Sequence, residues 1–86
     1  MKHPGTVALD AIEPMLRELR TLSGISERKR GVFYRKSRAF LHFHEDPKGL
    51  FADVRDGEWR RLPVTTDAER RELVHLIDEI LNEHGV

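Results

Sequence analysis

The stretch GVFYRKSRAFLHFHEDPKGLFADVRDGEWRRL, from Gly31 to Leu62, decides the fold. Its apolar residues alternate with polar ones at a period of two, which is typical of β-strands with one covered face. Turn-forming residues interrupt the pattern at Lys36-Ser37, Glu45–Gly49 and Asp56-Gly57, and the last pair suits a two-residue type I′ turn. We therefore predict four strands, near residues 31–36, 38–44, 50–55 and 58–62, joined as an antiparallel meander.

The sequence on either side of this stretch has a helical period. Ahead of it, one helix face holds Ile12, Met15, Leu16, Leu19 and Leu22, after a short turn over Val7–Ile12 and a start near Glu13-Pro14. This helix should end by Gly24. Behind the stretch, Thr66 and Glu69 form a capping box, and an apolar helix face follows at Leu73, Leu76, Ile77, Ile80 and Leu81, with Gly85 as its stop. The prediction is an α+β fold in which a helix, a four-stranded antiparallel β-meander and a C-terminal helix form a two-layer sandwich. The alternative is a mixed sheet with one strand paired out of order.

Composition limits the classes of protein to consider. A chain of 86 residues predicts a single domain over residues 1–86, of which 1–5 form a flexible leader. The sequence has no cysteine, which excludes disulfides and thiolate metal sites. Fifteen basic residues balance fifteen acidic ones, so the basic excess of a dedicated duplex-DNA binder is missing. We find neither a signal-peptide pattern nor an apolar run that would span a membrane, so we expect a cytoplasmic location and no membrane partner.

The two hairpins distribute the strand side chains over two faces of the sheet. The face predicted to be covered carries Val32, Tyr34, Ala39, Leu41, Phe43, Leu50, Ala52, Val54 and Trp59. The other face carries Phe33, Arg35, Arg38, Phe40, His42, His44, Phe51, Asp53, Arg55, Glu58, Arg60 and Leu62. On it we expect cross-strand pairs of Asp53 with Arg60 and of Arg55 with Glu58. A slip of one residue in either hairpin would exchange these lists.

The second face is more apolar than a solvated sheet face should be, because it holds Phe33, Phe40, Phe51 and Leu62. Three explanations compete. A helix covers this face as a second core, or the face pairs with its copy in a homodimer through these four residues. In the third, it lines a groove for a small ligand, with the histidines and arginines as polar contacts.

One short motif offers ligand chemistry. His42 and His44 lie on the same side of an extended strand, and Asp53 follows on the next strand. Two imidazoles and a carboxylate can hold a borderline metal ion or a small ligand. The competing interpretation is a pair of half-buried histidines that bond to their neighbours and bind nothing.

A second motif is basic. Arg28, Lys29 and Arg30, together with Arg35 and Arg38 of the first hairpin, are interleaved with aromatic residues. That combination suits single-stranded nucleic acid or an anionic ligand. The plainer interpretation is a solvated, charged surface.

The sequence lacks the constellations that catalysis needs. Its serines, at positions 23, 26 and 37, fall in turns, and its glycines are scattered rather than gathered in a phosphate-binding loop. We therefore expect neither an enzyme nor a cofactor. The biochemical function stays uncharacterised at this stage. The leading hypothesis is an interaction or structural module that homodimerises through its sheet, and the alternatives are ligand or metal binding and nucleic-acid binding.

Four segments also resemble a group of small bacterial proteins of unknown function: Gly24-Ile25, Gly31–Tyr34, Arg38–Asp46 and Gly49–Arg55. More loosely, they are similar to a domain labelled "luciferase" in some bacterial and fungal proteins. The small YjbR-like α+β proteins look like this chain in overall style only. The resemblance implies that His42, His44 and Asp53 belong to one group of residues. It does not imply light emission or any enzyme activity for this chain.

Overall fold

The computed structural model describes residues 2–84, which form three helices and a five-stranded antiparallel sheet. The helices are α1 (Thr6–Ala11), α2 (Glu13–Arg20) and α3 (Asp67–His84). The strands are β1 (Ser26–Lys29), β2 (Val32–Arg35), β3 (Arg38–Asp46), β4 (Gly49–Asp56) and β5 (Glu58–Pro63), and they neighbour one another in chain order. The predicted α+β meander is confirmed. The count of four strands is wrong, and so is the mixed-sheet alternative.

The strand that the sequence pattern missed is β1, at the edge of the sheet. Its residues, Ser-Glu-Arg-Lys, are polar and mostly exposed, so they lack the apolar alternation that marks a half-buried strand. The strand pairs with β2 through Ser26 opposite Tyr34 and Glu27 opposite Phe33. A polar edge strand of this kind also discourages pairing with another chain.

The two predicted helical regions are confirmed. Pro14 stands at the start of α2, where its missing N–H removes no hydrogen bond, and α1 ends just before it. The capping box of α3 is formed in both directions. The Thr66 hydroxyl accepts from the Glu69 amide at 3.1 Å, and the Glu69 carboxylate accepts from the Thr66 amide at 3.0 Å. The predicted stop at Gly85 lies outside the described residues.

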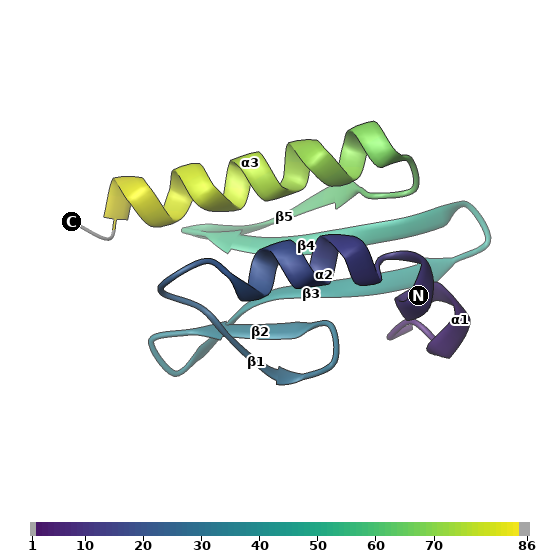
Figure 1. Cartoon of the computed structure of the whole chain (residues 1–86), viewed down its shortest axis with the longest axis horizontal. Coiled ribbons are helices and arrows are strands. Elements are labelled where there is room, and N and C mark those ends of the chain that lie inside the picture. Colours follow the sequence, from purple (N-terminus) through teal and green to yellow (C-terminus); the bar gives the residue numbers. More distant parts are fainter. Residues whose placement is uncertain (1, 85–86) are drawn as a thin grey trace.

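Both long helices cover the same face of the sheet. Figure 1 shows α2 in front of β3 and α3 running along β5, and the two helices contact each other. The core between helices and sheet contains Leu9, Ile12, Met15, Leu16, Leu19, Phe33, Phe40, Leu41, Phe43, Leu50, Ala52, Val54, Val64, Leu73, Ile77, Ile80 and Leu81. The first hypothesis for the second face, a helix on each side of the sheet, is therefore wrong.

A β-bulge in β3 changes the predicted assignment of the first hairpin. Phe33 lies opposite Leu41 and Tyr34 opposite Ala39, which leaves Phe40 as an extra residue without a partner position on β2. The bulge lets Phe40 and Leu41, although consecutive, both turn into the core, with 3% and 0% of their surface exposed. Phe33 is buried as well, so the phenylalanines at 33 and 40 lie on the covered face.

Two other residues of β2, Val32 and Tyr34, were predicted to lie in the core but lie outside it. Val32 lies opposite His42 and, like Tyr34, is only half-buried, on the face that the helices leave uncovered. The prediction that both belong to the core is wrong, because it assumed an unbroken alternation through β3.

The last hairpin is also shifted by one residue from the prediction. Asp56 lies opposite Glu58, with Gly57 between them at φ +78°. Arg55 therefore faces Trp59, and Asp53 faces Arg61, rather than Glu58 and Arg60. The slip takes Trp59 out of the core, and its side chain is 45% exposed.

The turn between β3 and β4 is tighter than predicted. Asp46 lies opposite Gly49, so two residues suffice where a five-residue loop was expected. Gly49 has φ +135°, and a Cβ at this position would lie 2.4 Å from Oγ1 of Thr65. That hydroxyl accepts a hydrogen bond from the Leu50 amide at 3.1 Å, and so it ties the start of α3 to β4.

The N-terminal residues run beside β3. Lys2 and Glu45 form an antiparallel bridge, and the Glu45 carboxylate accepts a hydrogen bond from the Gly5 amide at 3.0 Å. The flexibility predicted for residues 1–5 stays a prediction. Within residues 2–84, none of the helices is both long enough and apolar enough to cross a membrane.

Candidate metal or ligand site on the open sheet face

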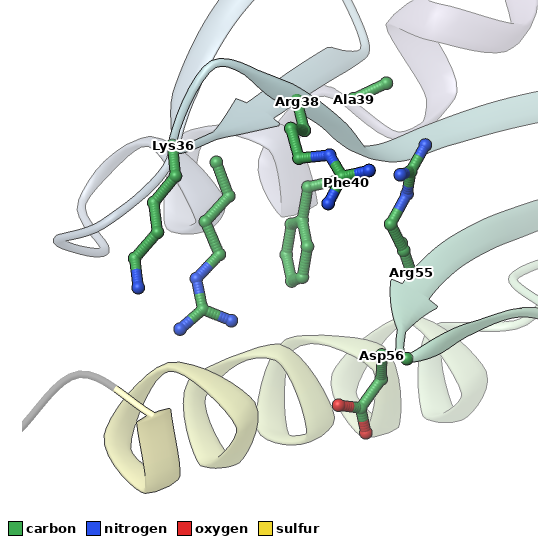
Figure 2. Close-up of a pocket in the computed structure, with 8 residues that line it drawn as sticks. Lys36, Arg38, Ala39, Phe40, Arg55 and Asp56 are labelled. Carbon is green, nitrogen blue, oxygen red and sulfur yellow. The ribbon is translucent and has the colours of Figure 1, made fainter.

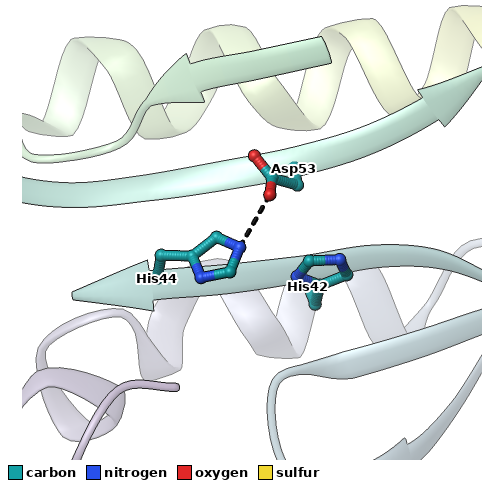
Figure 3. A group of neighbouring side chains, drawn as sticks. All are labelled: His42, His44 and Asp53. Atoms are coloured by element: carbon teal, nitrogen blue, oxygen red, sulfur yellow. Dashed lines mark hydrogen bonds and ion pairs between the residues drawn. The ribbon is translucent and has the colours of Figure 1, made fainter. Parts of the chain in front are cut away.

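We call the side of the sheet that faces away from α2 and α3 the open face. Beyond the bulge, successive strand residues point to opposite sides, so the burial of Leu41, Phe43 and Val54 directs the side chains at positions 42, 44 and 53 to this face. Figure 3 shows these three side chains, His42 and His44 on β3 and Asp53 on β4, in front of the sheet with the helices behind it. Trp59 and Arg61 of β5 join them through the pairing of β4 with β5.

Asp53 is the centre of this cluster. Its carboxylate accepts two hydrogen bonds from the Arg61 guanidinium, at 2.8 and 3.0 Å, and lies 2.6 Å from Nε2 of His44. Asp53 is only 8% exposed, so burial alone would favour its neutral form. The Arg61 hydrogen bonds outweigh that effect and lower the pKa of Asp53, which keeps the carboxylate ionised at neutral pH.

His42 is held in a different environment. Its ring lies 4.9 Å from the His44 ring and 4.9 Å from the Trp59 ring, measured between centroids. Burial lowers the pKa of His42, although the Asp53 charge opposes this change. Because an unperturbed histidine titrates near pH 6.5, His42 is a neutral imidazole at physiological pH, which is the form that binds metals.

His44 has one ring nitrogen with a partner and one without. Since Asp53 is ionised, Nε2 of His44 donates the hydrogen bond between them. In the neutral form of the ring, Nδ1 then carries the lone pair, and this atom is buried without a hydrogen-bond partner among the described residues. A carboxylate that orients one histidine nitrogen while the other faces a metal ion is a common arrangement in metal sites.

The three ligand-capable residues lie close enough to act together. One nitrogen from each of His42 and His44 and one oxygen from Asp53 all fall within 4.8 Å of one another. Both carboxylate oxygens of Asp53 are engaged by Arg61, whose positive charge opposes a cation at that carboxylate. The cluster therefore gathers two imidazoles and a carboxylate as candidate ligands, and the Asp53 carboxylate orients the His44 ring through Nε2.

The structure does not bring the predicted basic residues into one site. Arg28, Lys29 and Arg30 lie at the turn between β1 and β2, whereas Arg35 and Arg38 lie at the opposite end of β2. Arg30 is committed to ion pairs with Asp10 at 2.9 Å and with Glu13 at 2.8 Å. Arg28 stacks on Tyr34, with 4.8 Å from its guanidinium carbon to the ring centre.

The four residues of the predicted dimer interface do not lie on one surface either. Phe33 and Phe40 are buried in the chain's own core, so the prediction that they form an exposed interface is wrong. Leu62 is partly buried and packs against the core. Phe51 is half-buried opposite His44, next to the histidine cluster.

Sequence reasoning missed three residues near the site. The one-residue slip in the last hairpin put Trp59 on the covered face and paired Asp53 with Arg60, so that Arg61 was left out of the site. The correct register would have placed Arg61 opposite Asp53. His3 lies near His44 and Lys29, and burial followed by these two charges lowers the pKa of His3. Nothing in the periodicity of the leader marks His3 for this position.

Comparisons of the chain with known protein families, curated proteins and solved structures found no match. The resemblance to the luciferase-labelled domain and to the YjbR-like proteins therefore stays a prediction.

Proposed function

We propose that this protein binds a divalent transition-metal ion on its open sheet face, through His42 and His44. The observation that carries the proposal is the clustering of His42, His44 and Asp53, whose candidate ligand atoms lie within 4.8 Å of one another. We infer a two-layer arrangement of helices and sheet, which would leave this face open to solvent and to a metal ion.

The chemistry of the donors supports the choice of metal. Imidazole nitrogens suit zinc, copper and nickel, whereas magnesium and calcium prefer oxygen. The lowered pKa of His42 keeps its imidazole neutral at neutral pH, so that one ring nitrogen has a lone pair for a metal ion, and Asp53 fixes the orientation of His44. Water or a further ligand completes the coordination shell, as expected of an open rather than a purely structural site.

Calorimetric titration of metal-free protein with zinc tests the proposal. The wild type should bind one zinc ion, and His42→Ala should lose measurable binding while its circular dichroism stays unchanged. The matched control is His75→Ala, because His75 is exposed on α3 and outside the cluster. Zinc affinity that is the same in His42→Ala and His75→Ala would sink the proposal.

The other sequence-based hypotheses stand as proposals of lower rank. Self-association would have to use a surface other than Phe33 and Phe40, and sedimentation equilibrium at micromolar concentration tests it. Nucleic-acid binding through the first hairpin would lose affinity steeply with added salt, because phosphate contacts release counterions. A cytoplasmic location and a bacterial origin also remain proposals.

A further inference from the structure

A second candidate site lies at the end of the sheet, away from the histidine cluster. A hollow of about 420 Å³ opens between the β2–β3 turn and the β4–β5 turn. Among the described residues that line it, the basic side chains are Arg35, Lys36, Arg38 and Arg55, and the acidic one is Asp56. Figure 2 shows Lys36 and Arg38 extending from one side of the hollow and Arg55 from the other, with Phe40 between them.

The zero net charge of the chain conceals this concentration of positive charge. Between residues 26 and 63 there are ten lysines and arginines but six acidic residues, whereas α3 carries two arginines and six acidic residues. The sheet region is therefore basic and α3 is acidic. Among the described residues that line the hollow, four basic side chains outnumber one acidic one, so an anion that enters it meets a favourable field despite the neutral total.

The arginines are held in position by aromatic rings. The Arg55 guanidinium lies 4.7 Å from the centre of the Trp59 ring, and that of Arg35 lies 5.7 Å from the centre of Phe40. Nε of Arg55 is buried and, within residues 2–84, lacks a hydrogen-bond partner. A buried donor without a partner is rare in native proteins and calls for an acceptor.

We propose that this hollow binds the phosphate group of a small phosphorylated molecule. Guanidinium groups match the geometry of phosphate oxygens, and several cations around one hollow repel one another unless an anion lies between them. The β2–β3 turn adds support. Lys36 and Ser37 both have positive φ, 52° and 68°, which glycine or asparagine would adopt more easily, yet the turn keeps a lysine at the rim of the hollow.

Titration of the whole protein with sodium phosphate, at constant ionic strength set by sodium chloride, tests the inference. We expect saturable binding, with a shift of the Arg55 Nε–H resonance in the NMR spectrum. Adenosine monophosphate and inorganic phosphate then distinguish the source of the group. Much tighter binding of the nucleotide indicates a phosphorylated organic ligand, and equal binding indicates free phosphate. A shift that chloride reproduces at the same ionic strength would overturn the inference.

Substitutions locate the site. Arg38→Gln should weaken phosphate binding by about tenfold, which is the loss expected for one charge-assisted hydrogen bond. The matched control, Arg60→Gln, removes an exposed arginine of β5 that does not line the hollow, and it should change affinity by less than about twofold.

Equal effects of the two changes would mean non-specific attraction and would overturn the site. Binding of a uridine decamer that phosphate cannot displace would overturn it too, in favour of single-stranded nucleic acid. Zinc binding at the histidine cluster should be unaffected in both variants.

Discussion

The covered face and the open face of the sheet are made by alternate residues of the same strands, yet they differ in chemistry. The covered face packs Leu41, Phe43 and Val54 under α2 and α3. The open face carries a carboxylate, two imidazoles and a guanidinium in mutual contact. Burial of apolar area stabilises the fold, whereas the polar cluster supplies groups that can bind a ligand. Substitutions on the two faces should therefore have separable effects on stability and binding.

We expect the largest loss of stability from a substitution on the covered face, at the bulge. Phe40→Ala should lower the free energy of unfolding by about 3–5 kcal/mol, because it empties a buried ring position. Urea unfolding followed by circular dichroism measures this loss. The matched control is Phe51→Ala, which removes a half-buried ring from the open face and should cost clearly less. Equal losses would show that the bulge does not turn Phe40 inward. For the same reason we expect Phe40→Glu, which would bury a charge, to unfold the protein.

The second effect tests the centre of the open face. Asp53→Asn keeps the side-chain shape but removes the charge that Arg61 and His44 contact. We expect a loss of about 1.5–3 kcal/mol in unfolding free energy, the range for hydrogen bonds to charged groups. Thermal unfolding at pH 7 measures it, and Asp78→Asn, an exposed change on α3, is the control. A stability equal to that of the control would mean that the cluster is not formed in solution.

The third prediction concerns the pH dependence of stability that comes from an ion-pair network around Glu13, on the helix side of the molecule. Hydrogen bonds from Arg20, and then from Arg30, lower the pKa of Glu13 to about 2. A carboxyl group with a lowered pKa in the folded state stabilises the protein above its unfolded pKa, and that stability is lost as pH falls through the folded value. The melting temperature of the wild type should therefore fall between about pH 4.5 and pH 2.

Glu13→Gln isolates the contribution of that network. The variant should start with a lower melting temperature at pH 7 and lose less of it on acidification than the wild type does. The remaining decline reports the other carboxyl groups whose pKa values are lowered, which are Asp53, Glu27 and Glu69. Parallel curves for the variant and the wild type would show that Glu13 contributes nothing to acid sensitivity.

The sequence predicts the elements of this fold better than the faces of the sheet. The helices and four of the strands follow from periodicity, Pro14 and the capping box, which are local signals. The faces depend on the bulge at Phe40 and on the position of Gly57 in the last turn. The bulge is decided by tertiary packing, since Phe40 gains burial only when the helices are in place. A single displaced residue then reverses the orientation of a whole strand segment.

The candidate site was partly predictable for the same reason. His42 and His44 share a side in any unbroken strand, and Asp53 follows on the neighbouring strand whose pairing with β3 is regular. Arg61 could not be assigned because its position depends on the last turn. The basic hollow could not be assigned either, because it joins two turns that are distant in the sequence.

The smallest effect on stability, and the finest test of the open face, comes from Trp59→Ala. Trp59 is 45% exposed, so its loss should change the unfolding free energy by less than about 1 kcal/mol. Its ring nevertheless helps to cover His42, and burial is the main reason that the pKa of His42 is lowered. The variant should therefore raise the pKa of His42 toward its ordinary value, while Asp53, His44, Arg61 and His3 still act on the imidazole as before.

An NMR titration of metal-free protein measures this shift, and Trp59→Phe, which retains a ring, should show little of it. If the pKa of His42 is the same in all three proteins, the open face is more exposed to water than its geometry indicates, and His42 loses its advantage as a neutral ligand.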